Sequence, residues 1–246
     1  MKLAFLIEQK KPKLTMKRVK HIGIILDGNR RFAKRLMKQP WKGHEWGAQK
    51  VELLFSWCKE LGIPEITLYA FSLQNFNRPK REFDYLMTIF RKFLDKLKQD
   101  PRLKQDNIKV NFIGRIHLFA PDITRRMEAI MALTKSHRRH TFNFALAYGG
   151  REEIVDAVQE IGRMIEQGTV ASSNISEKLI ENHLYMKSNP DLSIRTGGET
   201  RTSNFLIWQS NYSEWIFLDK CWPEFEKEDL VQALQEFSRR ERRFGK

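Results

Sequence analysis

Apolar and polar positions along the 246-residue chain follow two periods. Short runs rich in β-branched and aromatic residues, typical of buried strands, lie at 22–26, 66–71, 109–114, 141–147, 191–195, 204–208 and 215–218. Longer segments with apolar residues three or four positions apart predict helices near 44–61, 82–98, 121–137, 151–167, 176–184 and 226–240. Because strands that alternate with helices imply βαβ units, we expect one α/β domain with a mainly parallel sheet covered on both faces.

Polar residues gather where three of these strands end. In an open parallel sheet, ligands bind at the carboxyl ends of the strands, so these loops are candidates for a site. They carry Asp27, Asn29, Arg30, Arg31, Ser72, Asn75, Arg78, Arg195, Arg201 and Ser203. This set predicts an anion site built around one carboxylate.

Each member also has a structural interpretation. Asp-Gly-Asn at 27–29 is a common turn, Gly197-Gly198 is compatible with another turn, and an isolated His44 is more often structural than catalytic. Arg195 differs, because an arginine that ends an apolar strand has to be paired or has to meet a ligand. The convergence of the loops therefore carries more weight than any single residue.

The loop after the first strand is suited to phosphate. Gly28, Asn29 and Arg30 precede a helical pattern, where backbone N–H groups can face phosphate oxygens, and Arg31 can add a bidentate contact. Asp27 would hold a Mg²⁺ ion that bridges the phosphates, since this ion takes one or two protein carboxylates. The sequence has no GxxxxGKS/T loop, no GxGxxG after the first strand and no DDxxD, which argues against P-loop, dinucleotide-binding and all-helical prenyl synthase sites.

The net charge of +14 is concentrated at the two ends of the chain. Residues 1–42 contain 13 Lys and Arg against two acids, residues 239–246 contain five against one, and residues 43–238 contain 26 against 27. This distribution indicates a polyanion near the termini, such as nucleic acid, anionic lipid or a phosphorylated small molecule, or else a solvated basic tail.

Cysteine content and hydropathy limit the class of protein. With only Cys58 and Cys221, a disulfide framework or a four-cysteine metal site is not expected, which favours a reducing cytoplasm. The chain has no apolar stretch of the roughly 18 residues that a membrane span requires.

Seven segments in one order resemble the cis-prenyltransferases, above all the undecaprenyl diphosphate synthases. They are HIGIILDGNRRFAKR, GHEWGAQ, ITLYAFSLQNFNRP, AYGGR, DLSIRTGGETRTSNFLIWQSNYSEWIF, WPEF and RRERRFG. The resemblance implies a basic segment at 1–20 and a catalytic domain at 21–246, with a six-stranded parallel sheet and a hydrophobic tunnel between sheet and helices. It also implies a homodimer that adds isopentenyl diphosphate units to an allylic primer, farnesyl or geranylgeranyl diphosphate, to make a long, undecaprenyl-like carrier lipid precursor.

The resemblance also assigns roles to residues. Asp27 and Asn75 correspond to the catalytic residues, and Asp27 and Glu214 to the groups associated with Mg²⁺. The substrate-binding positions are Gly28, Asn29, Arg30, Arg31, Phe32, His44, Ser72, Phe76, Arg78, Arg195, Arg201, Thr202, Ser203, Arg243 and Gly245. Among these, Arg195, Arg201 and Ser203 correspond to isopentenyl diphosphate ligands, and Arg243 and Gly245 to a terminal motif that reaches across the dimer.

Three departures from the bacterial pattern are visible. Arg30 stands where many bacterial members have Gly, Pro40 stands where they often have a phosphate-binding Arg, and the segment 99–106 is slightly longer. Two other functions compete with the enzyme: a non-catalytic scaffold subunit of a heteromeric synthase, and nucleic-acid binding through the basic ends. We expect instead that segment 1–20 associates transiently with an anionic membrane surface.

Overall fold

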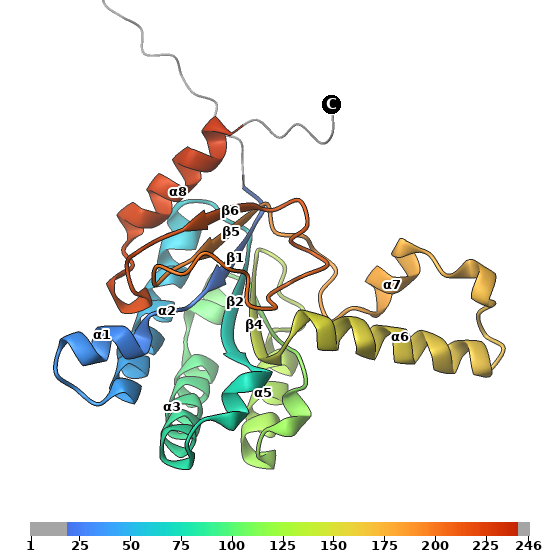
Figure 1. Cartoon of the computed structure of the whole chain (residues 1–246), viewed down its shortest axis with the longest axis horizontal. Helices are drawn as coiled ribbons and strands as arrows, with labels where there is room; N and C mark the ends of the chain where they lie inside the picture. Colours follow the sequence, from blue (N-terminus) through green and yellow to red (C-terminus); the bar gives the residue numbers. More distant parts are fainter. Residues whose placement is uncertain (1–18, 241–246) are drawn as a thin grey trace, which may run out of the picture.

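The computed structural model describes residues 19–240 and shows six parallel strands in one sheet, in the order β3-β4-β2-β1-β5-β6 (Figure 1). The strands are β1 (His21–Ile25), β2 (Glu65–Ser72), β3 (Ile108–Ile113), β4 (His140–Tyr148), β5 (Leu192–Arg195) and β6 (Glu214–Phe217). All five neighbouring pairs are parallel. The predicted fold class and the six-stranded sheet are confirmed.

Six of the helices agree with the predicted segments to within a few residues at most ends, whereas α1 and α4 are short helices outside those six segments. They are α1 (Asn29–Arg35), α2 (Gly43–Glu60), α3 (Lys80–Gln99), α4 (Arg102–Gln105), α5 (Pro121–Thr134), α6 (Gly150–Glu166), α7 (Glu177–His183) and α8 (Lys227–Arg239). Ser176 caps α7 as its position suggests, because its side chain accepts a hydrogen bond from the N–H of Leu179. No helix in the described part of the chain is long and apolar enough to cross a membrane.

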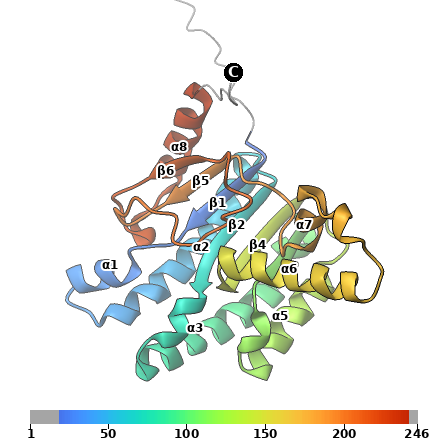
Figure 2. The same ribbon diagram turned by 45° about the vertical axis from the view of Figure 1, so that its right-hand side comes forward.

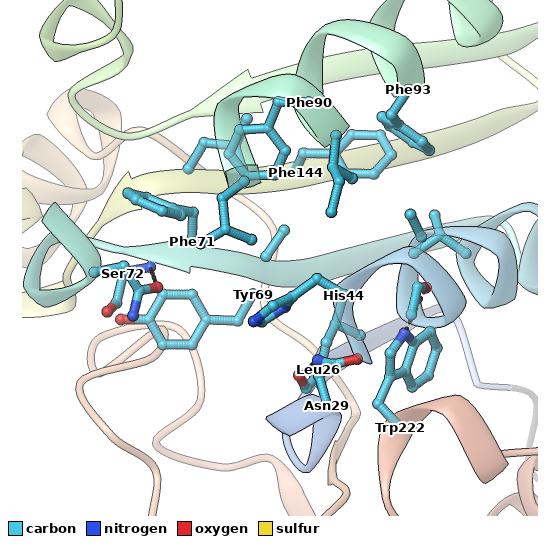
Figure 3. Close-up of a pocket in the computed structure, with 18 of the residues that line it drawn as sticks. Leu26, Asn29, His44, Tyr69, Phe71, Ser72, Phe90, Phe93, Phe144 and Trp222 are labelled. Carbon is cyan, nitrogen blue, oxygen red and sulfur yellow. Dashed lines mark hydrogen bonds between the residues drawn. The ribbon is translucent and has the colours of Figure 1, made fainter. Parts of the chain in front are cut away.

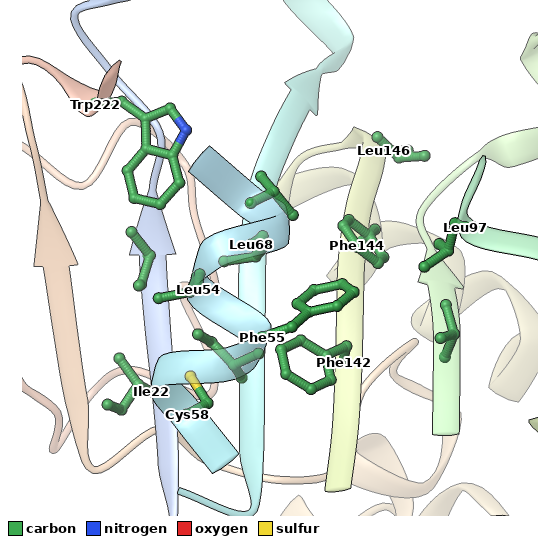
Figure 4. Close-up of a cluster of buried hydrophobic side chains, with 14 of the residues drawn as sticks. Ile22, Leu54, Phe55, Cys58, Leu68, Leu97, Phe142, Phe144, Leu146 and Trp222 are labelled. Atoms are coloured by element: carbon green, nitrogen blue, oxygen red, sulfur yellow. The ribbon is translucent and has the colours of Figure 1, made fainter. Parts of the chain in front are cut away.

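The larger core lies between the sheet and helices α2, α3, α5 and α8 (Figure 4). Phe55 of α2 packs against Phe142 and Phe144 of β4, with ring centroids 4.1 and 6.3 Å apart. Every residue of β1 is buried, as expected for a strand covered on both faces.

The opposite face of the sheet is also covered, as predicted, but largely by irregular segments of the chain. Its buried cluster includes Met186, Phe205 and Leu206, which lie in irregular segments between α7 and β6. Helices α6 and α7 project together to one side of the sheet (Figures 1 and 2).

The predicted strand at 204–208 is wrong. Ser203, Asn204 and Leu206 have φ of 50°, 65° and 46°, which no strand allows, and the segment forms a compact turn. Phe205 and Leu206 are fully buried under the sheet, so the run is apolar because of burial alone. Asn204 instead caps α6: its carbonyl accepts the Gly150 N–H at 2.7 Å.

The strand order reverses beside β1. The chain leaves β1 for β2 on one side, whereas β5, which follows much later in the sequence, pairs with its other side. A reversal of this kind opens a crevice at the carboxyl ends of the strands. The three polar loops predicted from the sequence follow β1, β2 and β5 and therefore meet at this edge.

Candidate active site

A cavity of about 280 Å³ lies between the carboxyl edge of the sheet and helices α2 and α3 (Figure 3). Its polar end is lined by Asp27, Asn29, His44, Ser72, Asn75, Arg78 and Arg195. Its apolar part includes Leu86, Ile89, Phe90, Phe93, Phe112, Ile123, Phe144 and Leu146. An apolar channel that ends in a cluster of charged and amide groups is suited to a ligand with an anionic head and a hydrocarbon tail.

Asp27 and Arg195 form the centre of the polar end. Arg195 is only 4% exposed, and its Nη2 donates to Asp27 Oδ2 at 2.9 Å. The N–H of Gly28 donates to Asp27 Oδ1 at 2.6 Å, and Arg31 Nη2 lies 3.4 Å from Oδ2. The arginine that ends the apolar β5 is thus paired, and the carboxylate faces two guanidinium groups.

Gly28 allows the chain to turn from β1 into α1. Its φ of 98° is a left-handed conformation, and a Cβ there would lie 2.7 Å from Cα and Cβ of Cys221. The carbonyl of Asp27 also accepts the N–H of Trp222 at 2.8 Å. Backbone contacts from a distant segment therefore fix the position of Asp27.

Asn29 presents an unsatisfied acceptor at the same place. Its Nδ2 donates to the Leu26 carbonyl at 2.9 Å, while its buried Oδ1 has no hydrogen-bond partner among the described residues. A Cβ on Gly43 would lie 1.8 Å from the Asn29 carbonyl oxygen, so α1 and α2 touch through their backbones. A buried amide oxygen without a partner is suited to a ligand that brings a donor or a cation.

His44 is neutral in this environment. Its pKa is lowered to about 3, chiefly by burial and also by the positive charges of Arg78 and Arg30. Its Nε2 lies 3.3 Å from Arg78 Nη1, which can only donate, so this nitrogen accepts. His44 can therefore position a cation or a donor but does not supply a positive charge.

The loop after β2 is held by a short helical turn at Leu73–Asn77. The backbone N–H of Ser72 donates to Asn75 Oδ1 at 2.9 Å, in a reciprocal capping arrangement. Phe76 packs against Phe71 with centroids 5.1 Å apart, which anchors the turn to the core. The loop thus places Ser72 and Asn75 at the cavity wall.

The loop after β5 surrounds the other side of Arg195. Arg195 Nη1 donates to Ser203 Oγ at 2.7 Å and to the carbonyl of Arg201. The guanidinium of Arg201 points elsewhere, where it pairs with Glu199 at 2.6 Å, and Thr202 is exposed. Ser203 is therefore the direct partner of Arg195, whereas Arg201 and Thr202 lie at the surface of the same loop.

The remaining predicted residues lie apart from this cavity. Phe32 packs edge-on against Trp46 with centroids 5.3 Å apart. Glu214 is the first residue of β6 and pairs in the sheet with Leu192, three positions before Phe217 pairs with Arg195. Its side chain forms an ion pair with Arg240 at 2.9 Å. Within one chain, Glu214 is thus at the far end of its strand from Asp27.

Arg243 and Gly245 lie outside the described residues, as does most of segment 1–20. Nothing in the structure therefore bears on their predicted roles.

Sequence reasoning missed several residues at this site. Trp222 lines the cavity and donates from Nε1 to the Gly47 carbonyl at 2.9 Å; its only signal is its place in the WPEF segment. Tyr69 lines the cavity from β2 and stacks on Phe205 at 4.9 Å. Glu82 lies behind Arg78, and the i,i+4 spacing of the two residues could have indicated the pair.

The acidic groups fit a metal shared with a substrate better than a resident metal. No cluster of three or more His, Cys, Asp or Glu side chains that could hold a metal is found within residues 19–240. Asp27 is a single, partly exposed carboxylate at the cavity mouth, beside the unpaired Asn29 Oδ1. This donor set suits Mg²⁺, which takes one or two protein oxygens and completes its shell with phosphate and water.

Known proteins match the chain over most of its length. A family model described as "Putative undecaprenyl diphosphate synthase" matches residues 25–245. The tritrans,polycis-undecaprenyl-diphosphate synthase (geranylgeranyl-diphosphate specific) of Thermococcus kodakarensis is 44% identical over 229 residues, 92% of this chain and 87% of that protein. An isoprenyl transferase of Thermus thermophilus is 44% identical over 233 residues, 92% of this chain and 89% of that protein.

Two solved structures are similar to the chain over most of its length. Lavandulyl diphosphate synthase from Lavandula x intermedia, in complex with dimethylallyl diphosphate, superposes with a TM-score of 0.88 and 36% identity, covering 93% of this chain and 98% of that chain. A probable undecaprenyl diphosphate synthase from Campylobacter jejuni gives a TM-score of 0.78 and 28% identity, covering 94% of this chain and 100% of that chain.

Proposed function

Because the chain belongs to the undecaprenyl diphosphate synthase family of prenyltransferases, we propose that it elongates an allylic diphosphate with isopentenyl diphosphate units. The reaction of this family is cis-prenyl transfer. The observation that carries the proposal is the cavity, in which Asp27, Arg195 and Arg78 line one end and phenylalanines line the other. We propose a long, undecaprenyl-like product that serves as a carrier lipid precursor for cell-wall or glycan synthesis.

Geranylgeranyl diphosphate is the primer that we favour over farnesyl diphosphate. The relative from Thermococcus kodakarensis, which is 44% identical, is named as specific for that compound. The allylic chain would lie in the apolar part of the cavity, against Phe90 and Phe93 of α3. Burial of its methyl and methylene groups there would supply binding energy of about 0.8 kcal/mol per CH₂.

The chain's own residues hold both substrates. Arg195, fixed by Ser203 and by the carbonyl of Arg201, orients isopentenyl diphosphate, whose double bond is a weak nucleophile and reacts only when well positioned. Arg31 and Arg78 hold the allylic diphosphate, and His44 orients Arg78 through its Nε2. When its allylic C–O bond breaks, the electron pair leaves with the diphosphate, so these donors stabilise the charge that develops there.

Asp27 and Asn29 would hold Mg²⁺ at the diphosphate. When bound, this ion neutralises the charge of the leaving diphosphate. In the ligand-free protein, the same carboxylate accepts a hydrogen bond from Arg195 at 2.9 Å, which holds the two loops together.

Loss of a proton restores the double bond after each new C–C bond. We assign Asn75 to this step as an orienting group, because its Oδ1 already accepts the Ser72 N–H. Among the described residues that line the cavity, Asp27 is already paired with Arg195, so the bound diphosphate is the proton acceptor that we favour.

A homodimer is the assembly that we propose. β6 is an edge strand among the described residues, and an edge strand offers unpaired N–H and C=O groups to another chain. Beside it, Phe217 and Tyr212 are 37% and 69% exposed, and aromatic residues of this kind are enriched in interfaces. Phe217→Lys should shift the sedimentation of the purified protein towards that of a monomer. The same substitution at the exposed Val158 of α6 should leave the sedimentation unchanged.

Segment 1–20 is proposed to attract the protein transiently to an anionic membrane, where the product is delivered. Deletion of residues 2–17 should reduce binding to vesicles that contain anionic lipid. Salt-sensitive binding of RNA by the same segment would instead support the nucleic-acid alternative.

The activity is tested with the purified chain, isopentenyl diphosphate, Mg²⁺ and either primer. Chromatographic sizing should show products much longer than the primer, and EDTA should abolish them. Asp27→Ala should lower the rate on the order of 10³-fold, which corresponds to a loss of roughly 4 kcal/mol of transition-state stabilisation. Full turnover by Asp27→Ala would overturn its role, and a purified chain without activity would favour the scaffold alternative.

A further inference from the structure

Glu82 is a buried carboxylate beside the polar end of the cavity. It lies in the first turn of α3, and its side chain is only 3% exposed. Arg78 Nη1 bonds its Oε1, and Arg30 Nη2 lies 3.8 Å from its Oε2. A carboxylate side chain this deeply buried needs partners that replace water, and these two arginines provide them.

Glu82 acts on the cavity through its neighbours. Arg78 and His44 line the cavity, whereas Glu82 does not. His44 Nε2 lies 3.9 Å from Glu82 Oε1, but the low pKa of the ring means that it brings no positive charge. The balance of charge at this corner is therefore one carboxylate against the two arginines.

We propose that Glu82 is a positioning residue that holds Arg78 and Arg30 in the substrate-free protein and competes with the allylic diphosphate for them. This inference rests on the proposed function, which brings an anionic group to Arg78. A diphosphate offers more charge and more acceptor oxygens than a single carboxylate, so it takes over the guanidinium groups when it binds. When the product diphosphate leaves, Glu82 recovers the same partners.

The same geometry explains why a carboxylate is present at an anion site. Without Glu82, Arg30 of α1 and Arg78, which precedes α3, would have no acidic partner within residues 19–240. The carboxylate keeps the arginines in place before the substrate arrives, which reduces the ordering cost of binding. It also repels the incoming anion, so diphosphate affinity is lower than the arginines alone would provide.

The competition is measured by calorimetric titration of the full chain with inorganic pyrophosphate in the absence of Mg²⁺. Glu82→Gln keeps the size of the side chain and a hydrogen-bond acceptor but removes the charge. We expect it to bind pyrophosphate about tenfold more tightly than the unmodified chain, because one nearby negative charge is lost. A residue that merely supported the fold would change the affinity in the opposite direction when substituted.

Asp84→Asn is the matched control. Asp84 lies on the same helix and carries the same charge, but it is 56% exposed and pairs with Lys80. Its substitution should change pyrophosphate affinity by less than about twofold, because exposed charges are screened. Thermal unfolding of each variant shows whether the fold is retained.

Glu82→Asp provides a second variant should the glutamine variant fail to fold. Its shorter side chain retains the charge but places the carboxylate farther from both arginines. Pyrophosphate should therefore bind about threefold more tightly than it does to the unmodified chain. Equal or weaker binding by the folded variants would overturn the competition. A protein that binds pyrophosphate but forms no prenyl product would refute the proposed reaction and leave the role of Glu82 standing.

Discussion

The ion pair between Asp27 and Arg195 joins two loops that are 168 residues apart in the sequence, and its strength can be measured. Asp27→Asn preserves the shape of the side chain and removes its charge. Arg195 is 4% exposed and would keep only Ser203 Oγ and the carbonyl of Arg201 as partners. The variant therefore leaves a buried cation without a counter-charge nearby.

The expected loss of stability follows from these exposures. Removing one partner of a buried ion pair costs about 3–5 kcal/mol. Asp27 is 34% exposed, so water screens part of the interaction, and we expect about 2 kcal/mol. For a chain of this length, that corresponds to a fall in Tm of about 4–8 °C.

A double-mutant cycle separates the interaction energy between Asp27 and Arg195 from the other effects of each substitution. Scanning calorimetry is carried out on Asp27→Asn, Arg195→Gln and the double variant without ligand. The double variant should be more stable than the sum of the single losses predicts, by about 1 kcal/mol or more, because it contains no unpaired charge. If the losses in unfolding free energy of the two single variants add up to the loss in the double variant, the argument that the two residues are paired is refuted.

An exposed ion pair serves as the control for this cycle. Arg91 and Asp122 make a two-bond contact at 2.7 and 3.1 Å, with both side chains more than one third exposed. Asp122→Asn should cost less than about 1 kcal/mol. A loss of stability as large as that of Asp27→Asn would show that burial does not determine how much an ion pair contributes to stability.

Other predictions concern the channel, the histidine and the glycine turn. Phe93→Ala should lengthen the products on chromatographic sizing, because the ring lines the apolar part of the cavity and packs on Phe144 at 5.6 Å; an unchanged length would place the limit elsewhere. The pKa of His44 is lowered from 6.5 to about 3, chiefly by burial. As pH falls, the unfolded chain therefore binds a proton at His44 before the folded chain does. The free energy of unfolding should fall by about 2 kcal/mol between pH 6.5 and pH 5. His44→Gln should therefore flatten the fall in Tm between pH 7 and pH 5, and an equal slope would contradict the burial argument. Gly28→Ala should lower Tm by several degrees and reduce activity, because a Cβ would meet Cys221 at 2.7 Å in a left-handed conformation; normal values of both would show that the turn is not constrained.

The sequence predicted the parts of the fold that depend on local pattern. β1 is wholly buried and has a continuous apolar sequence. Arg195 at the end of β5 was predicted to be paired or to meet a ligand, and in the structure it is paired with Asp27. Order along the chain placed the loops after β1, β2 and β5 on one edge, because the carboxyl ends of parallel strands coincide. The cavity at that edge also agrees with the tunnel implied by the resemblance.

Features that depend on tertiary contacts were not visible in the sequence. The run at 204–208 has the composition of a strand, but positive φ at Asn204 and Leu206 and burial under the sheet make it a turn. The resemblance assigns Arg201 to isopentenyl diphosphate, and the structure adds that its carbonyl accepts from Arg195 while its guanidinium pairs with Glu199. The register that sets Glu214 opposite Leu192 likewise depends on the pairing of β5 with β6, which the local sequence does not determine.

The central place of β1 in the sheet has a consequence for synthesis of the protein. β1 pairs with β5, and the first carboxylate of the cavity meets its arginine only when Leu192–Arg195 has left the ribosome. At about 5–20 residues per second, the 168 residues between them take roughly 8–34 s to be made. During that interval β1 is an open edge of a growing sheet, so a nascent chain stalled before β5 offers a site for mispairing that a chaperone would have to cover.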